Sequence, residues 1–369
     1  MTLALVFLAV LALAFANGAN DNFKGVATLH GSGRIPYRRA LYWATITTLA
    51  GSAAAIVLGS HLAATFSGTG IVPAGLVADP RLALSVASGA ALAVLLATRF
   101  GLPISTTHAL VGGLCGSGLV LAGSETNLGQ LGRVAVLPLL LSPLAACFLT
   151  YMAYRTLRRI RLALGINKDS CICVVQEKAV VTSSAYPLRT QATIGVLPPI
   201  VAHRAGCRAR HTGTVVGINA QTALDSTHFL STGIVSFARG LNDTPKIVAI
   251  LTGGAILKIE YSVVLVAVTM AIGGLVFARR VGLTMSQGIS PMNDGQGLSA
   301  NLVTAGLVLS ASWLAMPVST THVAVGSIFG IGAATGGGRK KAIARILLAW
   351  VITLPLAGFI AAITAQLVR

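Results

Sequence analysis

Long runs of apolar residues, separated by short polar or basic segments, dominate this chain. Several of the runs approach or exceed the length that crosses a ~30 Å hydrocarbon core as a helix. They lack the strict apolar–polar alternation of barrel strands, and aromatic residues make up only 5% of the chain. The pattern predicts an all-α integral membrane protein. The runs are Thr2–Ala16, Ala40–Leu58, Leu82–Ala97, Val134–Ala153, Val263–Phe277, Leu298–Ala315 and Ile346–Leu367.

The composition supports this prediction. Of the 369 residues, 54% are hydrophobic and 10% are charged, and the mean hydropathy is +0.81. A soluble protein of this size could not cover its surface with so few charges. Glycine occurs 41 times, also inside the apolar runs. Because glycine lets helices pack closely or break within lipid, we expect broken or re-entrant helices.

The formal charge of +18 would fit a nucleic-acid-binding protein, but its distribution indicates topology instead. The basic residues cluster between apolar runs that place them on one face, as the positive-inside rule predicts. We therefore expect a multi-pass protein of the cell (inner or plasma) membrane, surrounded by lipid, with cytoplasmic basic segments and no nucleic-acid partner. The clusters include Arg34, Arg38 and Arg39; Arg155, Arg158, Arg159 and Arg161; Arg279 and Arg280; and Arg339, Lys340 and Lys341.

Three of the five cysteines lie in the basic central segment: Cys171, Cys173 and Cys207. If that segment is cytoplasmic, disulfides are not expected there. The cysteines could form a zinc site with His203 or His211, but one Cys-x-Cys pair without a second paired motif is weak evidence. We expect no cofactor.

The chain repeats itself. Three blocks recur in the same order in both parts of the sequence, which makes chance similarity negligible. The paired blocks are Phe15–Lys24 with Phe237–Lys246, Pro103–His108 with Pro317–His322, and Arg133–Pro143 with Arg345–Pro355.

The repeat predicts three regions. Residues 1–154 form a first transmembrane repeat, 155–224 a basic cytoplasmic loop, and 225–369 a second transmembrane repeat. Each repeat is best interpreted as five crossings, about ten helices in all. An odd number of crossings inverts one repeat relative to the other, which is the architecture of many secondary transporters.

The Asn-Asp pairs, Asn20-Asp21 and Asn242-Asp243, interrupt apolar runs at the same place in each repeat. A carboxylate at the bilayer centre costs ~2.5–3.5 kcal/mol on insertion scales, so an unpaired structural aspartate there would be hard to explain. Carboxylate and carbonyl oxygens together suit a hard cation such as Na⁺. We therefore expect these four residues to hold a coupling cation.

A glycine precedes each pair, Gly18 or Gly240, and a lysine follows it, Lys24 or Lys246. The glycine would let the helix unwind and free carbonyl oxygens for the cation. Alternatively, each aspartate only pairs with the lysine three residues later. That alternative leaves the repeated asparagine unexplained.

The two Pro-x-Ser-Thr-Thr-His blocks resemble helix N-termini. Ser and Thr are good caps, and a glycine-rich apolar helix follows each block. Free N–H groups, the positive helix end and hydroxyl donors suit a tetrahedral oxyanion. Ordinary capping would explain one block but not two equivalent copies. The candidate anion-binding residues are Ser105, Thr106, Thr107, Ser319, Thr320 and Thr321, and His108 and His322 are candidates for a proton-carrying or capping role.

In these motifs the chain resembles the inorganic phosphate transporter (PiT) family, which includes bacterial low-affinity phosphate permeases and sodium–phosphate symporters. The resemblance covers both repeats. It implies inverted repeats, symport of phosphate with Na⁺ or H⁺, and often a homodimer. It also implies that the Asn-Asp and Ser-Thr-Thr residues surround phosphate and cation near the membrane centre. The chain departs from the family at Lys24 and Lys246, where small or amide residues are more usual, so the lysines could neutralise phosphate or replace a cation.

We therefore expect a secondary active transporter that imports inorganic phosphate, alone or as a metal–phosphate complex, by symport with Na⁺ or H⁺ through alternating access. The expected phosphate ligands are Asn20, Lys24, Ser105, Thr106, Thr107, Asn242, Lys246, Ser319, Thr320 and Thr321.

Three alternatives remain. A sulfate permease on the same scaffold would also bind a tetrahedral anion. A passive anion channel would need no paired aspartates. An intramembrane hydrolase could combine Ser105 with His108, or Ser319 with His322, but no nucleophile-elbow motif supports it. We expect a protein that is not an enzyme.

Overall fold

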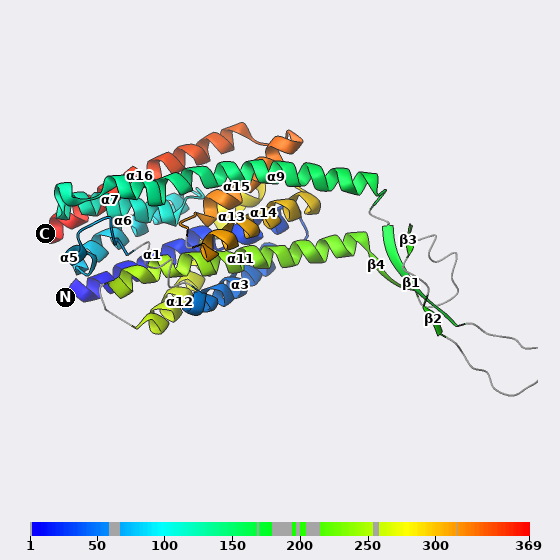
Figure 1. Ribbon diagram of the computed structural model, residues 1–369, viewed down its shortest axis with the longest axis horizontal. Coiled ribbons are helices and arrows are strands. Elements are labelled where there is room, and N and C mark those ends of the chain that lie inside the picture. Colours follow the sequence, from blue (N-terminus) through cyan, green and yellow to red (C-terminus); the bar gives the residue numbers. More distant parts are fainter. Residues whose placement is uncertain are drawn as a thin grey trace, which may run out of the picture. The chain divides into compact units, whose positions relative to one another are not determined.

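The computed structural model describes residues 2–58, 67–167, 170–178, 194–196, 200–203, 215–253, 258–314 and 316–369. These divide into two compact units. The first combines residues 1–154 with 228–369 and is helical, and the second spans residues 155–227 (Figure 1).

The first long helix of the chain, α1, ends at Asp21, the aspartate of the first Asn-Asp motif, and a short 3-10 turn follows it. The elements are α1 (Thr2–Asp21), the 3-10 turn (Lys24–Val26), α2 (Ala27–Gly31), α3 (Tyr37–Leu58), α5 (Ala74–Val77), α6 (Pro80–Arg99), α7 (Thr106–Leu121), a second 3-10 turn (Gly123–Glu125), α8 (Leu128–Leu131), a π-helical turn (Gly132–Val136) and α9 (Leu137–Ala163).

The second part of the chain repeats the order of long helices. Its first helix differs from α1 because it continues through the second Asn-Asp motif and through Pro245. The elements are α11 (Ala220–Gly253), α12 (Ile259–Phe277), α13 (Arg279–Leu283), a π-helical turn (Thr284–Gly288), α14 (Asp294–Trp313), α15 (Thr320–Thr335) and α16 (Lys340–Val368).

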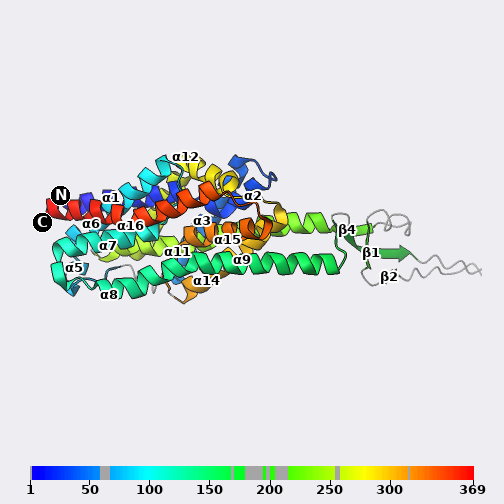
Figure 2. The same ribbon diagram turned by 90° about the horizontal axis from the view of Figure 1, so that it is seen from above.

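Equivalent helices run in opposite directions. Figures 1 and 2 show the two chain ends side by side. Helix α1 runs away from that end of the helical unit and α11 runs toward it, and α9 and α16 are opposed in the same way (Figure 1). This arrangement brings the equivalent motifs of the two parts together in the middle of the unit.

Six helical segments among the described residues are long and apolar enough to cross a membrane. Large apolar side chains are exposed along their outer faces, among them Leu144 and Phe148 of α9 and Val351 and Phe359 of α16. Asparagine, lysine and aspartate side chains are instead buried inside. This inversion of the soluble pattern fits a protein surrounded by lipid. The segments are Thr2–Gly31, Tyr37–Leu58, Pro80–Arg99, Leu137–Ala163, Ile259–Phe277 and Lys340–Val368.

The second unit contains short strands that the sequence analysis did not predict. Strand β1 (Ser170–Lys178) pairs antiparallel with β2 (Ile194–Val196), β3 (Ile200–His203) and β4 (Val215–Asn219). The β-branched residues of β1 favour an extended backbone. Of the candidate zinc ligands, Cys207 and His211 lie outside the described residues.

Glycines hold the two repeats in close contact. A Cβ added to Gly18 of α1 would lie 1.8 Å from the backbone oxygen of Met270 in α12. At the equivalent crossing, a Cβ on Gly240 of α11 would lie 2.1 Å from the oxygen of Thr48 in α3. Gly273 and Gly51 make the reciprocal contacts, with the oxygens of Phe15 and Phe237.

The prediction that Gly18 and Gly240 unwind their helices is wrong. Both lie within continuous helix. They are needed because only a residue without a Cβ lets the two backbones approach so closely.

We expect Gly18→Ala and Gly240→Ala each to destabilise the protein, because the added methyl group meets backbone rather than a movable side chain. Overpacking of this kind typically costs about 1–3 kcal/mol, which would lower the Tm measured in detergent. Gly306→Ala in α14 is the matched control, since its Cβ would meet nothing within 4 Å. The control should melt at the wild-type temperature or above. Equal Tm values for Gly18→Ala and Gly306→Ala would contradict the prediction.

Candidate functional site

Two helix N-termini face each other at the centre of the helical unit. Helix α7 begins after Ser105, whose Oγ accepts a hydrogen bond from the backbone N–H of His108 at 3.0 Å. Helix α15 begins after Ser319, whose Oγ accepts from the N–H of His322 at 3.2 Å. Both Pro-x-Ser-Thr-Thr-His blocks are therefore capped helix starts. Their serine hydroxyls accept hydrogen bonds from backbone N–H groups of the helices that they cap.

The two helix starts interlock through the threonine at the second helical position. Thr321 of α15 donates its hydroxyl hydrogen to the carbonyl of Ile104, which precedes α7, at 2.9 Å. The equivalent Thr107 of α7 lies 3.5 Å from the carbonyl of Val318, which precedes α15. Each helix start thus contacts the turn that leads into the other.

The first carboxylate, Asp21, lies at the end of α1 and is almost fully buried. One of its oxygens forms an ion pair with the ammonium of Lys24. The other accepts a hydrogen bond from the amide of Asn17 at 3.2 Å. The hydroxyls of Thr106 and Thr321 lie 3.5 and 3.4 Å from the carboxylate. Asp21 is therefore in contact with both helix starts.

The second carboxylate, Asp243, occupies the equivalent place in α11. Its oxygens lie 3.6 Å from the ammonium of Lys246 and 3.7 Å from the guanidinium of Arg239. The amide of Asn242 donates to it at 3.1 Å, and Thr320 lies 3.4 Å away. The Asn-Asp and Ser-Thr-Thr motifs of both repeats thus meet in one cluster.

The lysines connect the repeats. Lys24 donates to the side-chain oxygen of Asn20 at 2.7 Å, the carbonyl of Ile104 at 2.9 Å and the hydroxyl of Thr321 at 2.6 Å. Lys246 makes the equivalent contacts across the other junction, with the hydroxyl of Thr107 at 3.0 Å and the carbonyl of Val318 at 2.7 Å. The alternative of a merely intrahelical Asp–Lys pair is therefore insufficient, because each lysine also bonds the opposite repeat.

The asparagines Asn20 and Asn242 anchor the cluster to the third long helix of each repeat. Asn20 donates to Thr98 at 2.8 Å and to the carbonyl of Leu102 at 3.0 Å. The equivalent Asn242 accepts from Ser312 at 3.4 Å.

Two residues of the cluster were not among the sequence-based candidates. The amide of Asn17 donates at 3.4 Å to Asp243 as well as to Asp21, so it bridges the two carboxylates. Arg239 donates to the side-chain oxygen of Asn17 at 2.7 Å. The sequence contains a signal for both residues. Asn17 and Arg239 occupy equivalent repeat positions, and an arginine within a membrane-spanning segment is costly unless it is paired.

Three basic residues, Lys24, Arg239 and Lys246, and two carboxylates are buried in the cluster. With all five groups ionised, its formal charge is +1. No group of three or more His, Cys, Asp or Glu side chains in the described part of the chain could hold a metal ion. The surrounding donors are ammonium, guanidinium, amide and hydroxyl groups, which bind anions.

The two histidines, one in the first turn of α7 and one in the first turn of α15, pack against each other. The rings of His108 and His322 are 4.4 Å apart between centroids, and His322 packs against Trp350 at 4.0 Å. The indole N–H of Trp350 donates to the carbonyl of Pro103 at 3.0 Å. These contacts place the histidines where they support the turn before α7.

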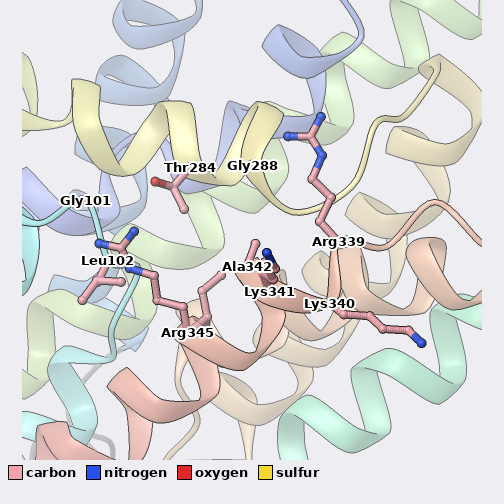
Figure 3. Close-up of a pocket in the computed structure, with 10 residues that line it drawn as sticks. Gly101, Leu102, Thr284, Gly288, Arg339, Lys340, Lys341, Ala342 and Arg345 are labelled. Atoms are coloured by element: carbon pink, nitrogen blue, oxygen red, sulfur yellow. The ribbon is translucent and has the colours of Figure 1, made fainter.

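A basic pocket of about 620 Å³ opens beside the same turn (Figure 3). Gly101 and Leu102 form one side of it, and Leu102 is the residue whose carbonyl accepts from Asn20. Figure 3 shows the Arg345 side chain extending toward Leu102. The pocket could receive an anion next to the buried cluster. Its remaining lining includes Thr284, Gly288, Arg339, Lys340 and Lys341.

Comparison with known proteins gives consistent matches. Residues 17–361 match the phosphate transporter family. A Pyrococcus abyssi protein that carries the name phosphate permease is 28% identical over 98% of this chain and 96% of its own length. A Rhizobium meliloti protein named as a low-affinity inorganic phosphate transporter is 28% identical over 95% and 91%. The solved structure of a sodium-dependent phosphate transporter matches 100% of this chain and 98% of its own, with a TM-score of 0.76 and 22% identity.

We expect Arg239→Asn to destabilise the protein, because it removes one partner of a buried ion pair while copying the residue of the other repeat. Such losses typically cost about 3–5 kcal/mol. Arg81→Asn is the control, since Arg81 pairs with Asp79 at 2.7 Å but has a side chain 43% exposed. That loss should cost only about 0–1 kcal/mol. Thermal unfolding in detergent measures both, and an equal decrease in Tm would contradict the expectation.

Proposed function

The chain belongs to the phosphate transporter family, and we propose that it imports inorganic phosphate by symport with Na⁺ or H⁺ through alternating access. The candidate phosphate site is the cluster between the N-termini of α7 and α15. The candidate cation ligands are the carboxylates of Asp21 and Asp243 with the neighbouring asparagines.

One observation carries the choice of site. The N-termini of two helices, with their threonine hydroxyls, meet at a buried cluster of formal charge +1. A tetrahedral oxyanion needs several donors from different directions and a compensating positive charge. Two opposed helix starts that both lysines contact, with Arg239 beside Asp243, meet both requirements.

The membrane potential supports coupling to a cation. Moving one negative charge into a cell against −100 mV costs about 2.3 kcal/mol. Net uptake of a phosphate anion therefore needs a cation that moves with it. Asp21 and Asp243 are the acidic groups within the cluster.

The paired architecture supports alternating access as the transport mechanism. We propose that the repeats form two inverted five-helix bundles that rock about the shared cluster. The reciprocal glycine contacts, Gly18 with Met270 and Gly240 with Thr48, support this pairing. We also propose that the basic pocket beside Leu102 faces the cytoplasm of the cell and receives phosphate released from the cluster.

Other functions have less support. The family match does not favour the sulfate permease considered from the sequence. A passive channel would not need the buried carboxylates, whose insertion into a membrane is costly.

We expect Asp21→Asn and Asp243→Asn each to reduce phosphate uptake by about 100-fold, because each removes a buried charge worth roughly 3 kcal/mol. Radiolabelled phosphate uptake into proteoliposomes, under separately imposed Na⁺, H⁺ and Mg²⁺ gradients, measures this. Asp79→Asn is the control, since Asp79 caps α6 outside the cluster and asparagine also caps helices. Unlabelled sulfate should not compete. Wild-type uptake by both cluster variants would overturn the assignment.

A further inference from the structure

The ammonium of Lys24 is surrounded by oxygen atoms. It contacts a carboxylate oxygen of Asp21, the amide oxygen of Asn20, the carbonyl of Ile104 and the hydroxyl of Thr321. Carboxylate, carbonyl and amide oxygens are the ligands that hard cations take in proteins. The Lys24 nitrogen thus occupies the centre of an oxygen cage suited to a small cation.

The second repeat contains a looser copy of this arrangement. Lys246 lies among a carboxylate oxygen of Asp243 at 3.6 Å, the carbonyl of Val318 at 2.7 Å and the hydroxyl of Thr107 at 3.0 Å. Carboxylate, carbonyl and hydroxyl come from the same repeat positions as in the first cage. The arrangement is therefore a property of the duplicated motif and not of one lysine side chain.

The cages have no room for a free cation while the lysines occupy them. The contacts of Lys24 with Asn20, Ile104 and Thr321 are 2.6–2.9 Å long, the distances of direct hydrogen bonds. Both lysine side chains are buried, at 3% and 2% exposure, so neither extends into solvent. A cation could enter only after an ammonium group had left.

Charge favours the same conclusion. Together with Arg239, the lysines already outnumber the carboxylates and give the cluster a formal charge of +1. One added Na⁺ would raise this to +2 in a buried site, and uncompensated buried charge is strongly unfavourable. One singly charged anion would instead neutralise the cluster. Charge balance in the cluster therefore favours a monovalent phosphate over an added metal ion.

We propose that Lys24 and Lys246 are tethered cations that occupy the positions of coupling Na⁺ ions, so that phosphate uptake by this chain does not depend on Na⁺. The substrate form is singly charged dihydrogen phosphate, and the proton gradient supplies the driving force. This inference rests on the proposed function of the same site and selects between the two coupling cations named there.

The first test compares uptake with and without Na⁺. Proteoliposomes containing the full chain take up labelled phosphate under an inward H⁺ gradient, with external Na⁺ or an equal concentration of choline. We expect wild-type rates that agree within about twofold. A tenfold or greater stimulation by Na⁺ would overturn the proposal.

The second test removes the lysine ammonium groups from the oxygen cages. In Lys24→Gln and Lys246→Gln the oxygen ligands remain but the ammonium is lost. We expect each variant to lose uptake in choline by at least tenfold and to recover part of it in Na⁺, because Na⁺ can now enter the cage. Lys258→Gln is the control, since Lys258 is exposed at the start of α12 and should behave as wild type.

A binding measurement keeps the inference separate from transport. We expect Na⁺, compared with choline, to raise the Tm of Lys24→Gln in detergent but to leave the wild-type Tm unchanged. A Na⁺-dependent increase in the wild-type Tm, or variants unresponsive to Na⁺ in both uptake and Tm, would overturn the proposal. If no gradient drives wild-type uptake, the proposed function fails, and the Tm comparison still decides whether the lysines replace Na⁺.

Discussion

The pairing of buried charges is the constraint on which the rest of this structure depends. Five ionisable side chains lie together in the helical unit, away from water. An isolated carboxylate or ammonium would be too costly there, so each needs partners of opposite charge and hydrogen bonds for its remaining atoms. Asp21 obtains them from Lys24, Asn17 and two threonines, which belong to both repeats. The repeats must therefore meet closely at this point.

Close approach of the helices makes that pairing possible. Gly18 lies one helical turn before Asp21, and Gly240 lies one turn before Asp243. Each glycine packs against the backbone of a helix from the opposite repeat. A larger residue at these crossings would separate the helices that carry the carboxylates. The glycine contacts and the charge cluster are thus two parts of one arrangement, in which backbone packing sets the distance between charged groups.

Much of this arrangement could be predicted from the sequence, because the duplicated motifs mark it twice. The apolar runs indicated membrane helices. Two repeated pairs, Asp21 with Asp243 and Ser105 with Ser319, marked polar positions within or beside those runs. What a repeat cannot show is which atoms meet between its copies. Gly18 looked like a point of unwinding because glycine permits both unwinding and close packing, and only the neighbouring helix decides between them. Asn17 and Arg239 are different residue types, so identity between the two repeats does not mark them.

That difference gives the cluster its charge. A site with asparagine at this position in both repeats would contain two aspartates and two lysines, and its formal charge would be zero. Arg239 stands where the first repeat has Asn17, and its guanidinium bonds to that asparagine. Asn17 in turn donates to both carboxylates, so the unequal pair spans the junction of the repeats. A neutral cluster would gain a negative charge with every bound anion, whereas the observed one becomes neutral with a single monovalent anion. One departure from the repeat thus gives the cluster a formal charge that a single monovalent anion would balance.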